Sequence, residues 1–206
     1  MEKNRVYPGD DLLTAAVIAS TYAEDIQAEP AEIWPWIVQV GYHRGGWYID
    51  AWWDRLIQNY FWPLIVPKED RGEFQPAAEE ILPDLQNLQM GDIVPDGPPG
   101  TAYYEVAEMV LDHYMILRSS SHFKYMLPKF TAGTRFEPHG MFTWAFILER
   151  RAPGITRLTI RFRGWGEPRL VVAFMKPVLL VVDYFHVREM LKGFKRRVES
   201  GGRLDM

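Results

Sequence analysis

The chain has 206 residues, contains no cysteine and carries a net charge of −4 at neutral pH. This length is sufficient for a hydrophobic core without covalent staples, and the lack of cysteine excludes disulfides, thiolate nucleophiles and cysteine-ligated metal sites. The slight excess of acidic residues gives no general attraction for nucleic acid, whose binding proteins usually present a basic face.

Neither a secretory signal nor a membrane span is predicted. The first residues are charged, and the apolar run of about 7 to 15 residues that a signal peptide needs does not follow them. The longest apolar stretch, residues 170–182, is interrupted by Lys176 and Pro177 and is shorter than the roughly 20 residues of a transmembrane helix. We expect this stretch to be buried, and the absence of cysteine fits a cytoplasmic location.

The N-terminal third predicts one strand followed by two helices. Residues 13–23 are rich in Ala, Val, Ile and Thr, which favours a strand. Pro30 suits the first turn of a helix, whose apolar residues continue at near-helical spacing to a stop at Gly41. Residues 51–61 predict a second, aromatic helix. Six of the eight tryptophans fall between positions 34 and 62, so this region is either an aromatic core or the wall of a pocket.

The middle of the chain changes from turn chemistry to strands. Residues 77–85 predict one or two helical turns, and turn residues bracket a short strand at Ile93. Beyond residue 100 the period-two pattern predicts strands at 104–110 and 113–118. Two further strands are predicted at 143–149 and 155–163, joined by a turn at 150–154.

The strand at 155–163 has the clearest alternation. Leu158, Ile160 and Phe162 are separated by polar residues, so we expect them to face the C-terminal helix. The residues between them include Arg157, Arg161 and Arg163, which we expect to face solvent.

The C-terminal part predicts a long amphipathic helix. Its apolar face consists of Tyr184, Val187, Met190, Leu191, Phe194 and Val198. Basic residues at 192–197 complement the helix dipole, and Gly201 and Gly202 supply the stop. No repeat or linker divides residues 1–206, so a single domain is predicted. The order of the elements indicates an α+β fold.

The residues that could carry chemistry give weak signals. The loop GYHRGGWY at 41–48 lacks the spacings of known phosphate-binding loops and follows a helix. Arg44 could pair with a ligand carboxylate, but we favour a role in holding loop carbonyls or Asp50 in place. The five histidines show no short metal-ligand spacing, so no metal or cofactor is predicted. His122 follows three serines without a nucleophile elbow, which favours a turn, and no catalytic residue is assigned.

Three stretches carry a resemblance to a known superfamily. They are residues 26–48 (IQAEPAEIWPWIVQVGYHRGGWY), 78–92 (AEEILPDLQNLQMGD) and 187–199 (VREMLKGFKRRVE). With the order of elements, they resemble the START-like (SRPBCC) superfamily of polyketide cyclases, dehydrases and lipid-transport proteins. The resemblance implies a helix-grip fold, in which a curved antiparallel sheet wraps around a long C-terminal helix and encloses an apolar cavity. Residues 58–74 depart from the pattern as an insertion, and we predict that 58–72 are mobile and gate the cavity.

The function implied by this resemblance is the binding or carriage of a small hydrophobic molecule, similar to a lipid or polyketide. We expect the cavity to be lined by Trp144, Phe146, Phe162, Tyr184 and Met190, with Arg44 or Tyr48 near its mouth.

Two alternative functions stay open. One is a cyclase-like or dehydratase-like enzyme in which a buried group such as His122 or Asp50 acts as general acid or base. The other is a structural or partner-binding module whose interior is filled by its own side chains.

Overall fold

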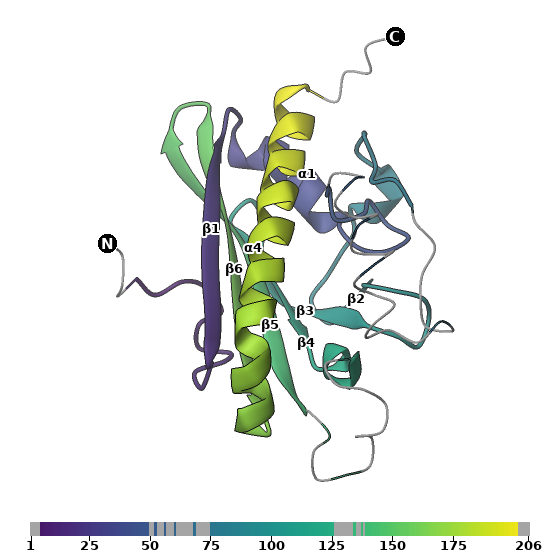
Figure 1. The fold of residues 1–206 in the computed structure, drawn as a ribbon. Helices are drawn as coiled ribbons and strands as arrows, with labels where there is room; N and C mark the ends of the chain where they lie inside the picture. Colours follow the sequence, from purple (N-terminus) through teal and green to yellow (C-terminus); the bar gives the residue numbers. More distant parts are fainter. Residues whose placement is uncertain are drawn as a thin grey trace.

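A computed structural model describes residues 5–49, 75–125 and 139–201, together with single positions at 52, 56, 60, 68, 134 and 137. The described strands form one six-stranded antiparallel sheet in the order β1-β6-β5-β4-β3-β2, and the long helix α4 crosses one face of it (Figure 1). The strands are β1 (Ile18–Ile26), β2 (Ile93–Pro95), β3 (Tyr103–Val110), β4 (Tyr114–Ser119), β5 (His139–Ala152) and β6 (Ile155–Glu167). The helices are α1 (Pro30–Val38) and α4 (Arg169–Glu199), with 3-10 turns η3 (Pro83–Leu85) and η4 (Ser121–Tyr125).

The β5–β6 hairpin lies in the interior of the sheet, between β1 and β4, and its register confirms the predicted alternation. Trp144 pairs with Phe162 and Phe146 with Ile160, so these side chains share the face that α4 covers. The hairpin turns at Gly154, whose φ of 72° lies in the left-handed region that glycine adopts without strain. Both strands extend beyond the predicted segments.

The opposite face of the sheet is covered by the N-terminal segment, which corrects the expectation that the arginines of β6 face solvent. Arg157 lies near the surface and pairs with Asp25 at 2.7 Å. Arg161 and Arg163 instead pair with Asp10, at 2.7 and 2.6 Å, and their side chains are only 16% and 15% exposed. Burial opposes ionisation of Asp10, but hydrogen bonds from the two arginines lower its pKa. The arginines therefore anchor the segment before β1.

The main core lies between the sheet, α1 and the C-terminal half of α4. Phe146 and Phe194 are fully buried there with Tyr48, whose ring centroid lies 4.7 Å from that of Phe194. Gly193 permits this packing, because a Cβ at that position would overlap the backbone carbonyl oxygen of Tyr48. Aromatic and aliphatic burial therefore fixes the C-terminal half of α4 against the sheet.

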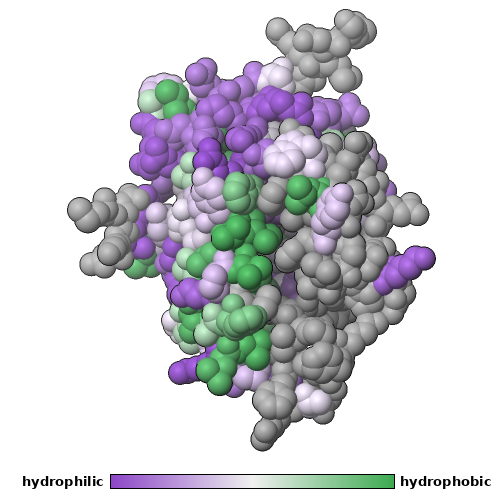
Figure 2. All heavy atoms as spheres, viewed as in Figure 1, coloured by the Kyte–Doolittle hydropathy of each residue, from purple (hydrophilic) through white to green (hydrophobic). Residues whose placement is uncertain are grey.

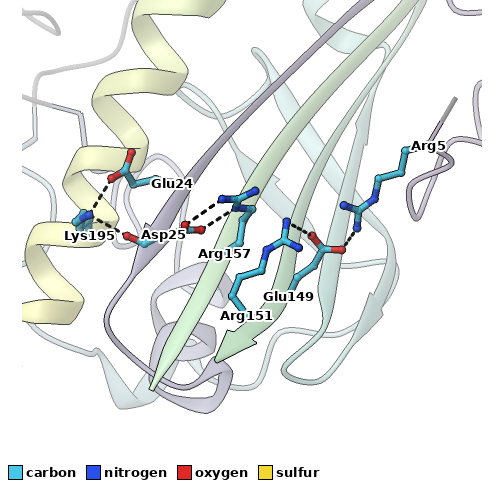
Figure 3. A network of polar contacts seen from close by, with 7 residues as sticks. All are labelled: Arg5, Glu24, Asp25, Glu149, Arg151, Arg157 and Lys195. Atoms are coloured by element: carbon cyan, nitrogen blue, oxygen red, sulfur yellow. Dashed lines mark hydrogen bonds and ion pairs between the residues drawn. The ribbon is translucent and has the colours of Figure 1, made fainter. Parts of the chain in front are cut away.

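Ion pairs fasten the same end of the molecule at its surface (Figure 3). Lys195 of α4 donates to the Glu24 carboxylate and to the backbone carbonyl of Asp25, both at 2.8 Å. The Asp25 carboxylate accepts two hydrogen bonds from Arg157, and Glu149 pairs with Arg151 and with Arg5. Exposed pairs of this kind contribute roughly 0 to 1 kcal/mol each, so they orient β1 and α4 more than they stabilise the fold.

Strand β1 and helix α4 also differ from the sequence prediction. The first strand begins at Ile18 and runs to Ile26, whereas it was expected at 13–23. Helix α4 begins at Arg169, so it includes the apolar stretch 170–182. That stretch was expected to be buried, which is wrong for much of it: Leu170 and Phe174 are 86% and 80% exposed.

Other predictions fall outside the described residues. The helix at 51–61 and the gate at 58–72 lie there except for four single positions, so both stay predictions, as does the single-domain organisation. The turns at 77–85 are represented by η3. Among the described helices, none combines the length and apolar composition that crossing a bilayer requires.

Candidate functional site

Four predicted wall residues lie at the interface between the sheet and α4, but in different surroundings. Phe146 and Met190 are fully buried in the main core. Phe162 packs against Phe142 with ring centroids 5.1 Å apart. Trp144 lies next to Phe162 in the register and contacts His186 of α4, with centroids 6.0 Å apart. Contact of these residues with a ligand stays a prediction.

Tyr184 lies on the outer side of the interface. Its side chain is 37% exposed, its ring meets Tyr22 edge-to-face at 5.8 Å, and its hydroxyl accepts a hydrogen bond from Arg188. It lines a groove of about 380 Å³ between β1 and α4. The groove residues are Thr21, Tyr22, Ala23, Glu24, Tyr184, Arg188, Leu191 and Lys192.

Arg44 and Tyr48 hold the loop after α1. The Arg44 guanidinium donates to the carbonyls of Val38 and Val40 at 2.9 and 3.0 Å, which satisfies the open end of α1. The buried Tyr48 hydroxyl donates to the carbonyl of Trp36 at 2.9 Å, and burial raises the pKa of Tyr48. The structural role that the sequence favoured for Arg44 accounts for these contacts, and ligand binding by either residue stays a prediction.

An aromatic cluster surrounds Trp144 under the middle of α4. The indole of Trp47 lies 5.4 Å from that of Trp144, and the Tyr104 ring stacks on Trp144 at 5.7 Å. Tyr104 also contacts the His122 ring at 4.6 Å. Rings from the loop after α1, from β3, from β5 and from α4 therefore converge on one place.

Among the residues that the structure describes, two indole nitrogens of this cluster have no hydrogen-bond partner. Nε1 of Trp47 and Nε1 of Trp144 are both buried, and no acceptor for either N–H lies in the described part of the chain. A buried donor without a partner costs about 1 to 3 kcal/mol, and buried polar groups in folded proteins are nearly always paired. These two donors therefore mark a position where an acceptor from outside the chain would be stabilising.

A carboxylate of α4 lies beside the cluster. Asp183 accepts a hydrogen bond of 2.5 Å from Ser20 on β1 and is also bonded by Tyr22. Burial outweighs these hydrogen bonds and raises the pKa of Asp183 to about 6. A carboxyl group with this pKa can both donate and accept a proton near neutral pH.

His186 lies one helical turn after Asp183, and its pKa is shifted in the opposite direction. Burial lowers the pKa of His186 to about 4, so the imidazole is neutral at physiological pH. Burial also raises the pKa of Tyr104, with the negative charges of Asp96 and Asp183 acting in the same sense. The cluster thus combines a protonatable carboxyl, a neutral imidazole and a protonated phenol.

A chain of hydrogen bonds connects η4 to the sheet beneath Tyr104. The His122 ring lies 2.8 Å from the Asp96 carboxylate through Nε2 and 2.7 Å from the Ser119 hydroxyl through Nδ1. Because a carboxylate only accepts, Nε2 carries the hydrogen of the bond to Asp96. Ser121 bonds both to Ser119 and to the backbone of Tyr103. This arrangement fits the turn that the sequence favoured for the serine run.

This chain is only remotely similar to known proteins. No family model matches the chain, and no curated protein matches it by sequence. Solved structures with similar folds include norcoclaurine synthase from Thalictrum flavum, which is 12% identical over 97% of this chain and 96% of that chain, with a TM-score of 0.49. Protein jhp0584 from Helicobacter pylori is 12% identical over 93% and 94% of the two chains, with a TM-score of 0.46. DynU16 from the dynemicin biosynthetic locus is 15% identical over 91% of this chain, which spans half of that chain, with a TM-score of 0.40.

This chain has the helix-grip fold. The arrangement of one antiparallel sheet around a long C-terminal helix is the one implied by the resemblance to the START-like superfamily. This topology places Ser20 and Trp144 on either side of Phe162 in one row of the sheet, and Trp144 contacts His186 of α4.

Sequence reasoning missed the polar members of this site. Asp183 and His186 stand three residues apart on one helix face, and Asp183 follows an apolar run. A single acid at the end of an apolar run was the signal in the sequence that could have identified Asp183. Asp96 and Tyr104 gave no comparable signal, because their proximity to α4 depends on the sheet order.

In the described part of the chain, His, Asp and Glu side chains form no group of three suited to a metal ion.

Proposed function

We propose that this protein binds a small, largely hydrophobic molecule between the sheet and the middle of α4. The observation that carries the proposal is the pair of buried indole N–H groups of Trp47 and Trp144, for which the described residues supply no acceptor. A carbonyl or ether oxygen of a ligand would satisfy one or both donors and remove the cost of leaving them unpaired.

The chemical character of the surroundings suggests the class of ligand. Trp47, Tyr104, Trp144 and His186 present ring faces and edges, and Phe162 adjoins Trp144 on the sheet. Flat, apolar walls with few polar groups favour a planar ring system bound mainly through desolvation and stacking. We therefore infer that the ligand is a polycyclic or aromatic ketone. This class is part of the broader group of lipid-like and polyketide-like molecules.

Two matched probes test the proposal. 1-Tetralone carries one fused aromatic ring and one ketone, and tetralin has the same rings without the oxygen. We expect 1-tetralone to shift the ¹⁵N–¹H indole signals of Trp47 and Trp144 in an NMR titration. We expect tetralin to bind more weakly by about three- to tenfold, which corresponds to one hydrogen bond.

The Trp36 signal in the same spectrum and the variant Trp144→Phe serve as controls. Trp36 is buried in the main core, and its signal should stay unchanged. Trp144→Phe should reduce the preference for the ketone over tetralin. Equal binding of the two probes in the wild-type protein would remove the role of the indole donors. Failure of both probes to bind would favour an interior filled by its own side chains.

A second candidate function is acid–base catalysis on the bound molecule. The observation in its favour is that Asp183 and His186, one turn apart on α4, have pKa values displaced in opposite directions, to about 6 and about 4. Such divergence is typical of paired catalytic groups. Above pH 6 the Asp183 carboxylate would accept a proton from the carbon next to a ketone and return it, while an N–H or O–H donor stabilises the enolate oxygen.

Exchange of the α-hydrogens of 1-tetralone in D₂O tests this second function. We expect the protein to accelerate exchange, with a rate that rises with pH through about 6. Asp183→Asn should abolish the acceleration while the indole shifts persist, because the asparagine retains the shape of the site. Exchange at the rate of buffer alone, despite binding, would leave binding as the function.

A further inference from the structure

The hydrogen-bond chain at η4 has the connectivity of a nucleophile, a base and an orienting carboxylate. The Ser119 hydroxyl lies 2.7 Å from Nδ1 of His122, and the Asp96 carboxylate lies 2.8 Å from Nε2 of the same ring. When the imidazole is neutral, the hydrogen on Nε2 leaves the lone pair of Nδ1 free to accept the hydroxyl proton. The two ring nitrogens exchange their roles relative to serine proteases, which leaves the acid–base chemistry unchanged.

The turn at η4 has anchors other than these three side chains. The Ser121 hydroxyl accepts a hydrogen bond from the backbone N–H of Tyr103 and donates one to its carbonyl, which fastens η4 to β3. The loop that contains Asp96 is closed by a hydrogen bond of 3.0 Å from its backbone N–H to the carbonyl of Ala102. A polar network beyond what the local structure needs is typical of a functional site.

The three side chains, which we call the Ser119 triad, adjoin the proposed ligand site. Ser119 pairs with Phe142 in the sheet and Leu117 pairs with Trp144, so Ser119 and Trp144 share a face. The Tyr104 ring lies 4.6 Å from the imidazole of the triad and also stacks on Trp144. An acyl group on the Ser119 oxygen would therefore lie beside the aromatic cluster.

The nucleophile is sheltered, whereas the other two members of the triad reach solvent. Ser119 is 4% exposed, and the side chains of His122 and Asp96 are 16% and 22% exposed. The exposed apolar side chains of α4, which Figure 2 shows along the lower part of the molecule, belong to a different surface that points away from this face of the sheet. This combination suits a reaction in which an apolar acyl donor binds inside and water enters past the base.

We propose that the Ser119 triad hydrolyses aryl esters. This inference rests on the proposed binding site, with an ester carbonyl in place of the ketone. Ser119 Oγ attacks the carbonyl carbon while its proton passes to Nδ1 of His122, and the tetrahedral intermediate expels the aryloxide, which takes that proton. Water then attacks the acyl group and gives a proton to Nδ1, and Ser119 Oγ leaves and recovers it. The products are a phenol and a carboxylic acid.

Asp96 is a positioning residue in this reaction. Its carboxylate accepts the hydrogen on Nε2 and so selects the tautomer in which Nδ1 faces Ser119 as a base. It also stabilises the imidazolium that forms when the hydroxyl proton is transferred.

Hydrolysis of 1-naphthyl acetate by the full chain tests the proposal, because its bicyclic ring matches the proposed ligand class. We expect 1-naphthol release at least about a hundredfold faster than in buffer. Mass spectrometry of quenched samples should find the acetyl group on Ser119, and a fluorophosphonate should label the same residue in the wild-type chain. Ser119→Ala should abolish both adducts, and His122→Gln should slow acetylation about a hundredfold.

The role of Asp96 has its own readout. Asp96→Asn should slow acetylation at least about tenfold, and Asp96→Glu should restore part of the rate, because the longer carboxylate can still accept from Nε2. Both variants should keep the indole shifts caused by 1-tetralone, which shows that the site is folded. Loss of the indole shifts in Asp96→Asn would mean that Asp96 only maintains the structure.

Ser120→Ala and His113→Gln are matched controls, because both residues are exposed and lie outside the triad. Neither should change the rate. Acetylation at other residues, or release at the buffer rate, would overturn the esterase proposal, and the indole shifts with 1-tetralone would still decide the binding proposal separately. Acetylation of Ser119 without any indole shift would retain the reaction and remove the assigned ketone ligand.

Discussion

The interface between the sheet and α4 has two ends that are built differently. Around the C-terminal half of α4, Tyr48, Phe146 and Phe194 are fully buried, and the Tyr48 hydroxyl has its acceptor. Around the middle of α4, the indole N–H of Trp144 has no acceptor among the described residues, and burial raises the pKa of the Asp183 carboxyl group. The first end has the properties of a structural core. The second includes polar groups that stability alone would not select, which is typical of a functional site.

The largest expected effect is at the structural end. Gly193→Ala places a Cβ against the carbonyl oxygen of Tyr48, which belongs to the backbone and cannot rotate away. We expect a loss of about 5 kcal/mol or more in the free energy of unfolding, measured by chemical denaturation. In a helix with free space, the same change would add about 1 kcal/mol of stability. A variant as stable as the wild type would therefore contradict the close approach of α4 to Tyr48.

Phe194→Ala should also be costly, because it leaves a cavity between Tyr48 and Phe146. The ring centroids lie 4.7 and 6.2 Å from that of Phe194. We expect a loss of about 3 to 5 kcal/mol in the free energy of unfolding. Phe185→Ala, which removes a 45% exposed ring from the same helix, is the matched control and should cost less than about 1 kcal/mol. Similar losses for both variants would mean that the loss of stability comes from a change in the helix itself and not from a cavity in the core around Phe194.

At the functional end, Asp183 and His186 should make the free energy of unfolding depend on pH. The folded-state pKa of Asp183 is raised from 3.8 to about 6, so its contribution to stability falls as the pH rises through that range. The pKa of His186 is lowered from 6.5 to about 4, so its contribution increases as the pH rises from about 4 to 6.5. In the wild-type protein the two contributions to stability therefore change with pH in opposite directions and partly cancel.

Single variants should separate these slopes. Relative to the wild type, Asp183→Asn should gain stability as the pH rises from about 4 to 6.5, and His186→Gln should lose it, each by on the order of 2 kcal/mol. Denaturation curves at several pH values measure both differences, and other titrating groups cancel in the comparison. Slopes of the same sign in the two variants would show that these groups do not titrate as a displaced pair.

Much of the fold was predictable because local patterns specify it. Alternation at Leu158, Ile160 and Phe162 gave the face of β6, and Gly154 gave its turn. The apolar stretch 170–182 was misinterpreted for a physical reason: a hydrophobic run predicts burial unless another surface covers it. Its exposed residues return every three or four positions, a helical period that was present in the sequence but applied only from Tyr184 onward.

The candidate site was less predictable than the fold. Trp144 was identified because strand alternation directs it toward the helix. Asp183 and His186 acquire their character only from burial against β1 and β5, which depends on the β1-β6-β5 strand order. Neither residue type nor spacing encodes that desolvation. The same limit applies to Asp10, which binds Arg161 and Arg163 across more than 150 residues of sequence.

The smallest expected effect on stability is at Trp144 itself. Trp144→Phe deletes a buried N–H for which the structure describes no acceptor, and it removes part of a ring from the aromatic cluster. The first change is favourable by about 1 to 3 kcal/mol and the second unfavourable by a similar amount, so the free energy of unfolding should change by less than about 1 kcal/mol. Trp36→Phe, in the packed core beside Tyr48, should cost more. A loss at Trp144 equal to that at Trp36 would mean that the two ends of the interface are packed alike, and that the indole donors give no reason to place a ligand between them.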